Sequence, residues 1–121
     1  MNSGQMLERA RTFIYKNARL LDRRRYEYFF ENGSKEAVID ALRAYQNRDG
    51  GFGNALEPDI RGPHSQPQAV EMALVTMDEV DGFAPDLLEG IARYLQSITL
   101  PDGGIPLVLR SASAYPHAPW W

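Results

Sequence analysis

The sequence contains no cysteine among its 121 residues. This absence excludes disulfide bridges, thiolate zinc sites and a cysteine nucleophile. It also has no apolar run near the ~20 residues that a membrane-crossing helix needs. The first residues lack the apolar stretch of a secretory signal. We therefore expect a cytoplasmic chain with no membrane span.

An excess of positive charge is also lacking. Thirteen basic and sixteen acidic residues give a net charge of −3 and an isoelectric point near 5.3. A nucleic-acid-binding domain normally carries a basic surface, so we expect no nucleic-acid partner. The composition, 44% hydrophobic and 24% charged, is typical of a folded chain with a core. The length predicts a single domain over residues 1–121.

The alternation of polar and apolar residues that strands require is almost absent. Apolar residues instead recur at three- and four-residue steps, which predicts helices over 6–21, 34–45, 65–80 and 85–98. Residues 26–30 continue the first helix, and Asn32-Gly33 stops it. Ser34 is a suitable N-cap, Pro85 suits a first helical turn, and Ser65 with Gln68 has the spacing of a capping box. These patterns predict an all-α fold.

A glycine- and proline-rich segment separates the second and third helices, over residues 47–64. A segment of this length without secondary structure is usually either functional or disordered. Phe52, Leu56 and Ile60 are spaced along it as if they were buried. We therefore predict an ordered segment that contributes to the core.

A motif near the middle of the chain recurs close to its end. Gln46 precedes Asp49-Gly50-Gly51-Phe52, and Gln96 precedes Asp102-Gly103-Gly104-Ile105. The glutamines are 50 residues apart, and Gly50 and Gly103 are 53 apart. We predict helical hairpins of about 50 residues that bury their faces by stacking. Each glutamine would bond free groups at helix ends, and each apolar residue would fill a gap between hairpins.

Gln46, the Asp49–Gly53 motif and Pro58-Asp59, followed by a capped helix, resemble the repeat of protein prenyltransferase β subunits and squalene–hopene-type terpene cyclases. The resemblance implies part of an α/α toroid, in which inner and outer helices alternate around a central apolar cavity. It implies N-terminal helices over 1–33, one repeat over 34–83 and a truncated repeat over 84–121. An isoprenoid or another apolar small molecule would occupy the cavity.

Two motifs that the resemblance leads one to look for are missing. In the prenyltransferase pattern an Asp-x-Cys pair holds zinc; Asp59 matches the aspartate, but Arg61 stands in place of the cysteine. A guanidinium does not ligate metal, and His64 and His117 match no metal-binding spacing. The Asp-x-Asp-Asp acid of hopene-type cyclases is absent. We therefore predict no metal site and no cofactor.

Glu57, Asp59 and His64 are the candidate catalytic residues. Two carboxylates and a histidine close together can supply a general acid and base. Alternatively, the acids cap helices or Asp59 pairs with Arg61.

Three functions follow from the sequence: a prenyltransferase- or cyclase-like enzyme, a non-catalytic toroid that binds a ligand or partner, and a carbohydrate-active toroid with Glu57 and Asp59 as its acid and base.

The candidate ligand-binding residues are aromatic, with one arginine. Aromatic residues can line an apolar or sugar pocket, although they more often fill cores. Trp120 and Trp121 need a surface to cover, so we expect either the remainder of a longer chain or self-association to complete the ring. The predicted ligand-binding set is Phe52, Arg61, Tyr115, Trp120 and Trp121.

Overall fold

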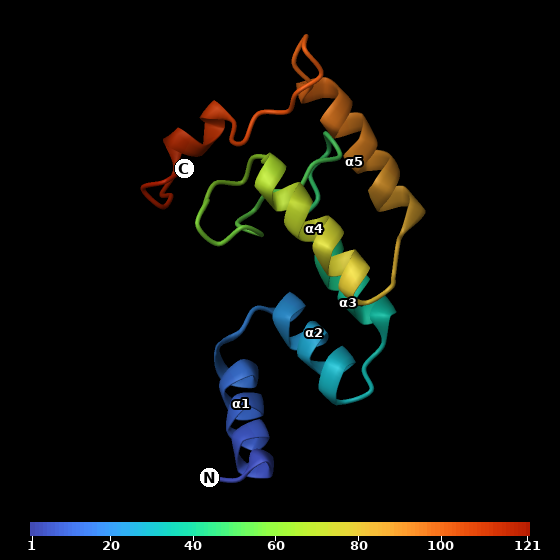
Figure 1. Cartoon of the computed structure of the whole chain (residues 1–121), viewed down its shortest axis with the longest axis vertical. Helices are drawn as coiled ribbons and strands as arrows, with labels where there is room; N and C mark the ends of the chain where they lie inside the picture. Colours follow the sequence, from blue (N-terminus) through green and yellow to red (C-terminus); the bar gives the residue numbers. More distant parts are fainter. The chain divides into compact units, whose positions relative to one another are not determined.

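The computed structural model describes residues 1–121 and consists of helices (Figure 1). It has no strands; only two isolated bridges pair extended residues, Gln46 with Phe52 and Ile60 with His117. The predicted all-α class is therefore confirmed. The helices are α1 (Ser3–Asn17), α2 (Leu20–Phe30), α3 (Lys35–Arg43), α4 (Pro67–Glu79) and α5 (Pro85–Ile98), with a short 3₁₀ helix, η1 (Arg110–Ala114).

The chain divides into two compact units, unit 1 (Met1–Ala41) and unit 2 (Leu42–Trp121). The toroid arrangement and the subdivision into repeats stay predictions. Each helix is too short or too polar to span a lipid bilayer.

The single helix predicted over residues 6–21 is wrong, because the chain breaks it into α1 and α2. Ala18 (ψ 157°) and Arg19 (ψ 158°) are both extended. The Asn17 side chain donates to the Phe13 carbonyl and so bonds one of the last free oxygens of α1. Neither Ala18 nor Arg19 is a helix breaker, so residue type alone does not predict the bend.

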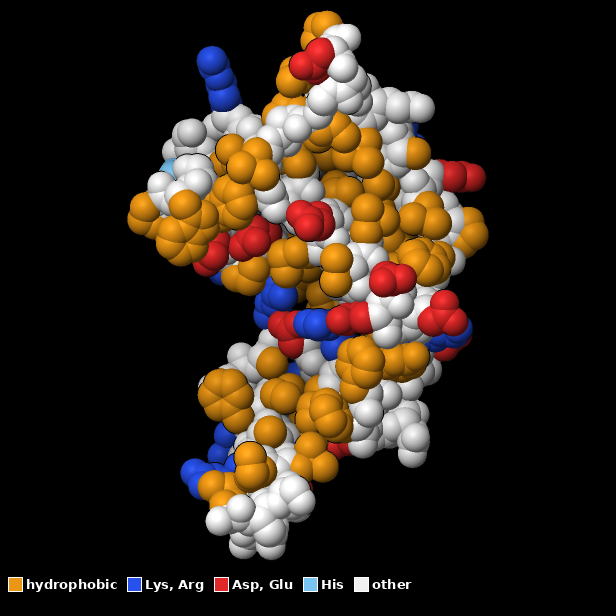
Figure 2. All heavy atoms as spheres, in the orientation of Figure 1, with side chains coloured by type: hydrophobic (Ala, Val, Ile, Leu, Met, Phe, Trp, Pro, Cys, Tyr) orange, Lys and Arg blue, Asp and Glu red, His pale blue; other side chains and the backbone are white.

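Side-chain caps and aromatic contacts organise unit 1. Asn2 and Gln5 form a reciprocal capping box at the start of α1, with bonds of 2.9 and 3.0 Å. Tyr26 stacks on Phe30 and meets Tyr15 edge-on, which joins α2 to α1. Other hydrophobic side chains of this unit are exposed, as the orange surface in Figure 2 shows; they include Met6, Phe13, Leu20 and Phe29.

The predicted start of α3 is confirmed. The Ser34 hydroxyl accepts a hydrogen bond from the Ala37 backbone N–H at 3.1 Å, as an N-cap does. Upstream, Asn32 has a φ of +56°, and the Gly33 N–H donates back to the Glu27 carbonyl. This backbone reversal ends α2 and leads into the cap.

The segment between α3 and α4 contributes to the core of unit 2 together with the helices. Phe52, Leu56 and Ile60 are all buried, so the prediction that this segment contributes to the core is confirmed. Other buried side chains come from α4 and α5. They are Ala69, Val70, Ala73, Met77, Leu87, Ile91 and Tyr94.

The start of α5 agrees with the sequence prediction, and that of α4 does not. Pro85 occupies the first turn of α5. The capping box predicted at Ser65 and Gln68 is wrong, because Gln66 is the N-cap residue of α4 and no side chain caps this end. The Ser65 hydroxyl is instead bonded to Asn47 and Asp49. The Ser65 hydroxyl thus bonds two side chains distant in sequence instead of a backbone N–H of α4.

Candidate functional site

The two Asp-Gly-Gly motifs form the same turn, which we call the first turn (residues 47–52) and the second turn (residues 100–105). Gly50 and Gly103 both have a φ of +88°. In each turn, the aspartate side chain accepts from the N–H of the second glycine, at 2.9 Å for Asp49 and 2.8 Å for Asp102. Two backbone hydrogen bonds also recur 53 residues apart. Asn47 N–H donates to Gly51 O as Leu100 N–H does to Gly104 O, and Gly50 N–H donates to Asn47 O as Gly103 N–H does to Leu100 O.

The first turn is held tightly against α5. A Cβ added to Gly50 would lie 2.0 Å from the carbonyl oxygen of Gly90, so only glycine permits this approach. The half-buried Gln46 side chain donates to the carbonyls of Gly50 and Leu87, which joins the turn to the helix. Gln46 therefore joins a turn to the side of a helix, and its predicted bonding to free groups at helix ends is wrong.

The second turn has no such neighbour. A Cβ on Gly103 would meet nothing within 4 Å. Ile105 is 45% exposed, whereas Phe52 at the same place in the first turn is 0% exposed. Gln96 lies exposed within α5, so its predicted buried bonding role is wrong. The two motifs share a turn but not their surroundings.

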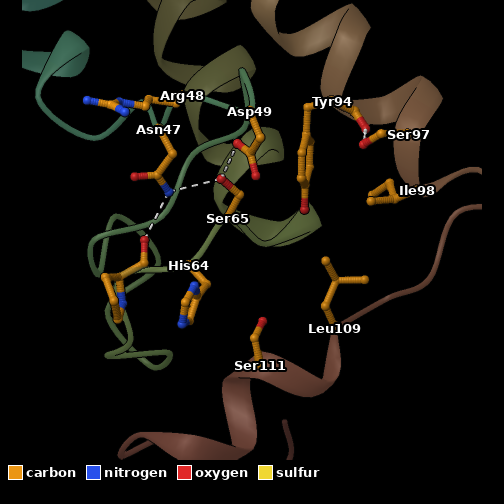
Figure 3. A pocket seen from close by; sticks show the side chains of 11 residues that line it. Asn47, Arg48, Asp49, His64, Ser65, Tyr94, Ser97, Ile98, Leu109 and Ser111 are labelled. Atoms are coloured by element: carbon orange, nitrogen blue, oxygen red, sulfur yellow. Dashed lines mark hydrogen bonds between the residues drawn. The ribbon is translucent and has the colours of Figure 1, made fainter.

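A pocket of about 530 Å³ opens beside the first turn (Figure 3). The first turn, the segment before α4, the end of α5 and the start of η1 all contribute to its walls. Most of the lining side chains are polar. The lining residues are Asn47, Arg48, Asp49, Pro63, His64, Ser65, Tyr94, Ser97, Ile98, Leu109 and Ser111. We call this cavity the Tyr94 pocket.

A network of hydrogen bonds fixes one wall of the Tyr94 pocket. The Ser65 hydroxyl donates to Asp49 Oδ1 at 2.7 Å and accepts from Asn47 Nδ2 at 2.9 Å. Asn47 Nδ2 also donates to the carbonyl of Pro63. The second carboxylate oxygen, Asp49 Oδ2, takes part in none of these bonds. Asp49 is therefore held in place while one oxygen is left for another donor.

Tyr94 forms the facing wall. Its side chain is only 2% exposed, yet its hydroxyl has no hydrogen-bond partner in the protein. Burial, with a smaller contribution from the charge of Asp49, raises the pKa of Tyr94 to about 12. The phenol is therefore neutral at physiological pH and available as a donor. In Figure 3 the hydroxyl points into the space between Ser65 and Leu109.

The residues predicted to be catalytic are not gathered into a single site. Glu57 Oε1 accepts from the Asp59 backbone N–H at 2.7 Å, so these two residues form a local turn. Asp59 and His64 are exposed, and of the three only His64 lines the Tyr94 pocket. No group of three or more histidine, aspartate or glutamate side chains is placed to hold a metal ion.

The residues predicted to bind a ligand are also dispersed. Phe52 is buried in the core and does not line the Tyr94 pocket, which corrects its predicted role. Arg61 donates to the carbonyl of Pro58. Tyr115 contacts the His64 ring at 5.8 Å between centroids. Trp120 is 69% exposed, and Trp121 is half-buried with its indole N–H buried and unpartnered.

Of the residues that line the Tyr94 pocket, sequence reasoning singled out only His64 as a candidate site residue. Tyr94 lies within the helix predicted over 85–98, on its apolar stripe, and Ser65 was predicted to be a helix cap. Asp49 was noted only as part of the recurring motif. A tyrosine in an apolar stripe carries a hydroxyl that requires a partner, and this was the one signal in the sequence.

No protein-family model, curated protein or solved structure matches this chain. The resemblance to prenyltransferases and terpene cyclases therefore depends on the sequence motifs alone.

Proposed function

We propose that this chain is a binding module with the α/α hairpin organisation of a partial toroid, and that it holds a small molecule in the Tyr94 pocket. The observation that carries the proposal is the Tyr94 hydroxyl, which is buried, unpartnered and directed into a cavity. A buried hydroxyl without a partner costs roughly 1–3 kcal/mol. A ligand that accepts a hydrogen bond from this hydroxyl recovers this free energy.

The recurring turn supports the hairpin part of the proposal. Identical backbone geometry at Gly50 and Gly103 is expected of two copies of one structural unit. In the first copy, the turn fixes Asp49 beside Ser65 and so builds one wall of the pocket. The scaffold and the site thus depend on the same motif.

An isoprenoid ligand fits this pocket less well than a polar one. An alkyl chain beside Asp49 and Tyr94 would keep the hydroxyl unpaired and remove water from the carboxylate, and both effects are unfavourable. Acid–base catalysis by Glu57 and Asp59 is likewise not favoured, because neither residue lines the Tyr94 pocket. Binding is the function that this geometry supports best.

A ligand-observed NMR screen of small molecules tests the proposal. Ser97 is an exposed residue of α5 that lines the pocket, so Ser97→Trp is expected to obstruct the cavity without disturbing the core. The adjacent Gln96→Trp is the matched control, because Gln96 is also exposed but lies outside the lining. We expect ligand signals that Ser97→Trp removes and Gln96→Trp preserves. The proposal is wrong if no compound shows this difference.

The exposed second turn favours a second candidate function, self-association. Helix α5 covers the first turn, whereas the second turn leaves Leu100, Ile105 and Leu107 exposed. Hydrophobic side chains lie at this end of unit 2 in Figure 2. We propose that a helix of a second protein molecule covers the second turn. Sedimentation velocity should show dimers that Ile105→Lys dissociates and Val75→Lys, at an exposed site on α4, does not. A monomer at all concentrations contradicts this.

A further inference from the structure

Three polar groups around the Tyr94 pocket have hydrogen-bonding capacity that the protein does not use. The Tyr94 hydroxyl is neutral and unpartnered. Asp49 Oδ2 is an acceptor outside the network that fixes Oδ1. Ser111 Oγ accepts from Gln66 Nε2 at 2.9 Å, which leaves its own proton to donate. The cavity therefore offers two donors and one anionic acceptor.

The charge of the site argues against an anionic ligand. Asp49 is the one acidic side chain in the lining, and it would repel a phosphate or carboxylate. Arg48 also belongs to the lining, but in Figure 3 its guanidinium extends away from Tyr94 and Ser111. No cationic group is therefore directed at the centre of the pocket to offset the repulsion.

A simple ammonium ligand would use only part of the site. The ammonium group would donate to Asp49, but it has no lone pair that could accept a hydrogen bond from the hydroxyl of Tyr94 or Ser111. A hydroxyl group both donates and accepts, so neighbouring hydroxyls on one molecule can satisfy all three groups. The side chains of Ile98 and Leu109 add apolar surface to the lining, which suits the C–H face of a sugar ring or polyol.

We infer that the ligand of the Tyr94 pocket is a neutral polyhydroxy compound, a sugar or a polyol, with one hydroxyl donating to Asp49 and others accepting from Tyr94 and Ser111. The inference rests on the proposed binding function and specifies its ligand class. It assigns no bond cleavage.

The test compares small polyhydroxy ligands that differ in charge, with one apolar alcohol beside them. Glucose, myo-inositol and xylitol form the neutral set; glucosamine, gluconate and glucose 6-phosphate form the charged set; geraniol represents apolar ligands. Saturation-transfer NMR and calorimetry on the whole chain measure binding. We expect the neutral set to contain the tightest binders and both anions to bind at least tenfold more weakly.

Matched substitutions locate the binding. Asp49→Asn retains an oxygen that can accept from Gly51 but removes the charge, and we expect a loss of affinity of about tenfold or more, as for a hydrogen bond to a charged group. Asp102→Asn makes the same change in the second turn and should leave affinity unaltered. Tyr94→Phe should weaken binding up to about tenfold. Circular dichroism confirms that each variant is folded.

The outcomes separate this inference from the proposed function. If only charged or apolar compounds bind, and Ser97→Trp blocks them, the polyol assignment is wrong and the binding function stands. Equal affinity of Asp49→Asn and Asp102→Asn for a neutral binder also overturns the assignment, since Asp49 would then play no part. If no compound of any set binds, the polyol assignment is wrong, and the binding function is wrong as well when the wider screen finds no ligand that Ser97→Trp removes.

Discussion

The paired turns allow a substitution with an internal control, because Gly50 and Gly103 share a φ of +88°. Alanine at either position suffers the same left-handed strain, about 1–2 kcal/mol. At Gly103 nothing else opposes the new methyl group. At Gly50 the Cβ would lie 2.0 Å from the Gly90 carbonyl oxygen, so the turn and α5 must separate. Overpacking of this kind adds about 1–3 kcal/mol or more.

We therefore expect Gly50→Ala to lower the free energy of unfolding by at least about 2 kcal/mol more than Gly103→Ala does. Urea denaturation followed by tryptophan fluorescence measures this difference. Both tryptophans, Trp120 and Trp121, lie in unit 2, so the signal reports on the unit that contains both turns. Equal losses for the two variants would refute the close contact between the first turn and α5.

Three further predictions concern unit 2. Tyr94→Phe should raise the stability of the ligand-free protein by about 1 kcal/mol, because it removes a buried hydroxyl without a partner. Since the pKa of Tyr94 is raised to about 12, the wild type should lose stability between about pH 10 and 12, and the phenylalanine variant should lose less in urea titrations; the raised pKa of Tyr15 leaves a residual loss. Ser65→Ala should cost about 1–2 kcal/mol in thermal unfolding, because it removes bonds to both Asp49 and Asn47. Arg43 lowers the pKa of the Asp86 carboxyl, so the stability from this pair should fade below about pH 4, and Asp86→Asn should flatten the acid limb of a stability–pH profile.

Local chemistry predicted much of the fold. Ser34 and Pro85 act at helix starts as expected, because a cap or a first-turn proline depends only on nearby backbone. The break at Ala18 and Arg19 was missed, since both residues are compatible with a helix. Whether the chain bends there depends on packing between α1 and α2, which periodicity does not report.

The site was harder to predict because its partners are distant in sequence. Ser65 matched a local capping pattern, but Asp49, sixteen residues earlier, competes for the same hydroxyl and binds it. The aspartate of a turn and a tyrosine in the last half of α5 meet only after the chain has folded. Glu57 and Asp59, adjacent enough to suggest a reactive pair, form a turn by themselves.

Gly90 has a bearing on the order in which unit 2 folds. A glycine inside a helix weakens that helix by about 1 kcal/mol relative to alanine, so α5 is a poor helix in isolation. The same glycine lets Gly50 and the Gln46 side chain approach the helix backbone. Helix formation and turn docking should therefore be coupled in one cooperative step, and refolding kinetics should show no early phase belonging to α5 alone.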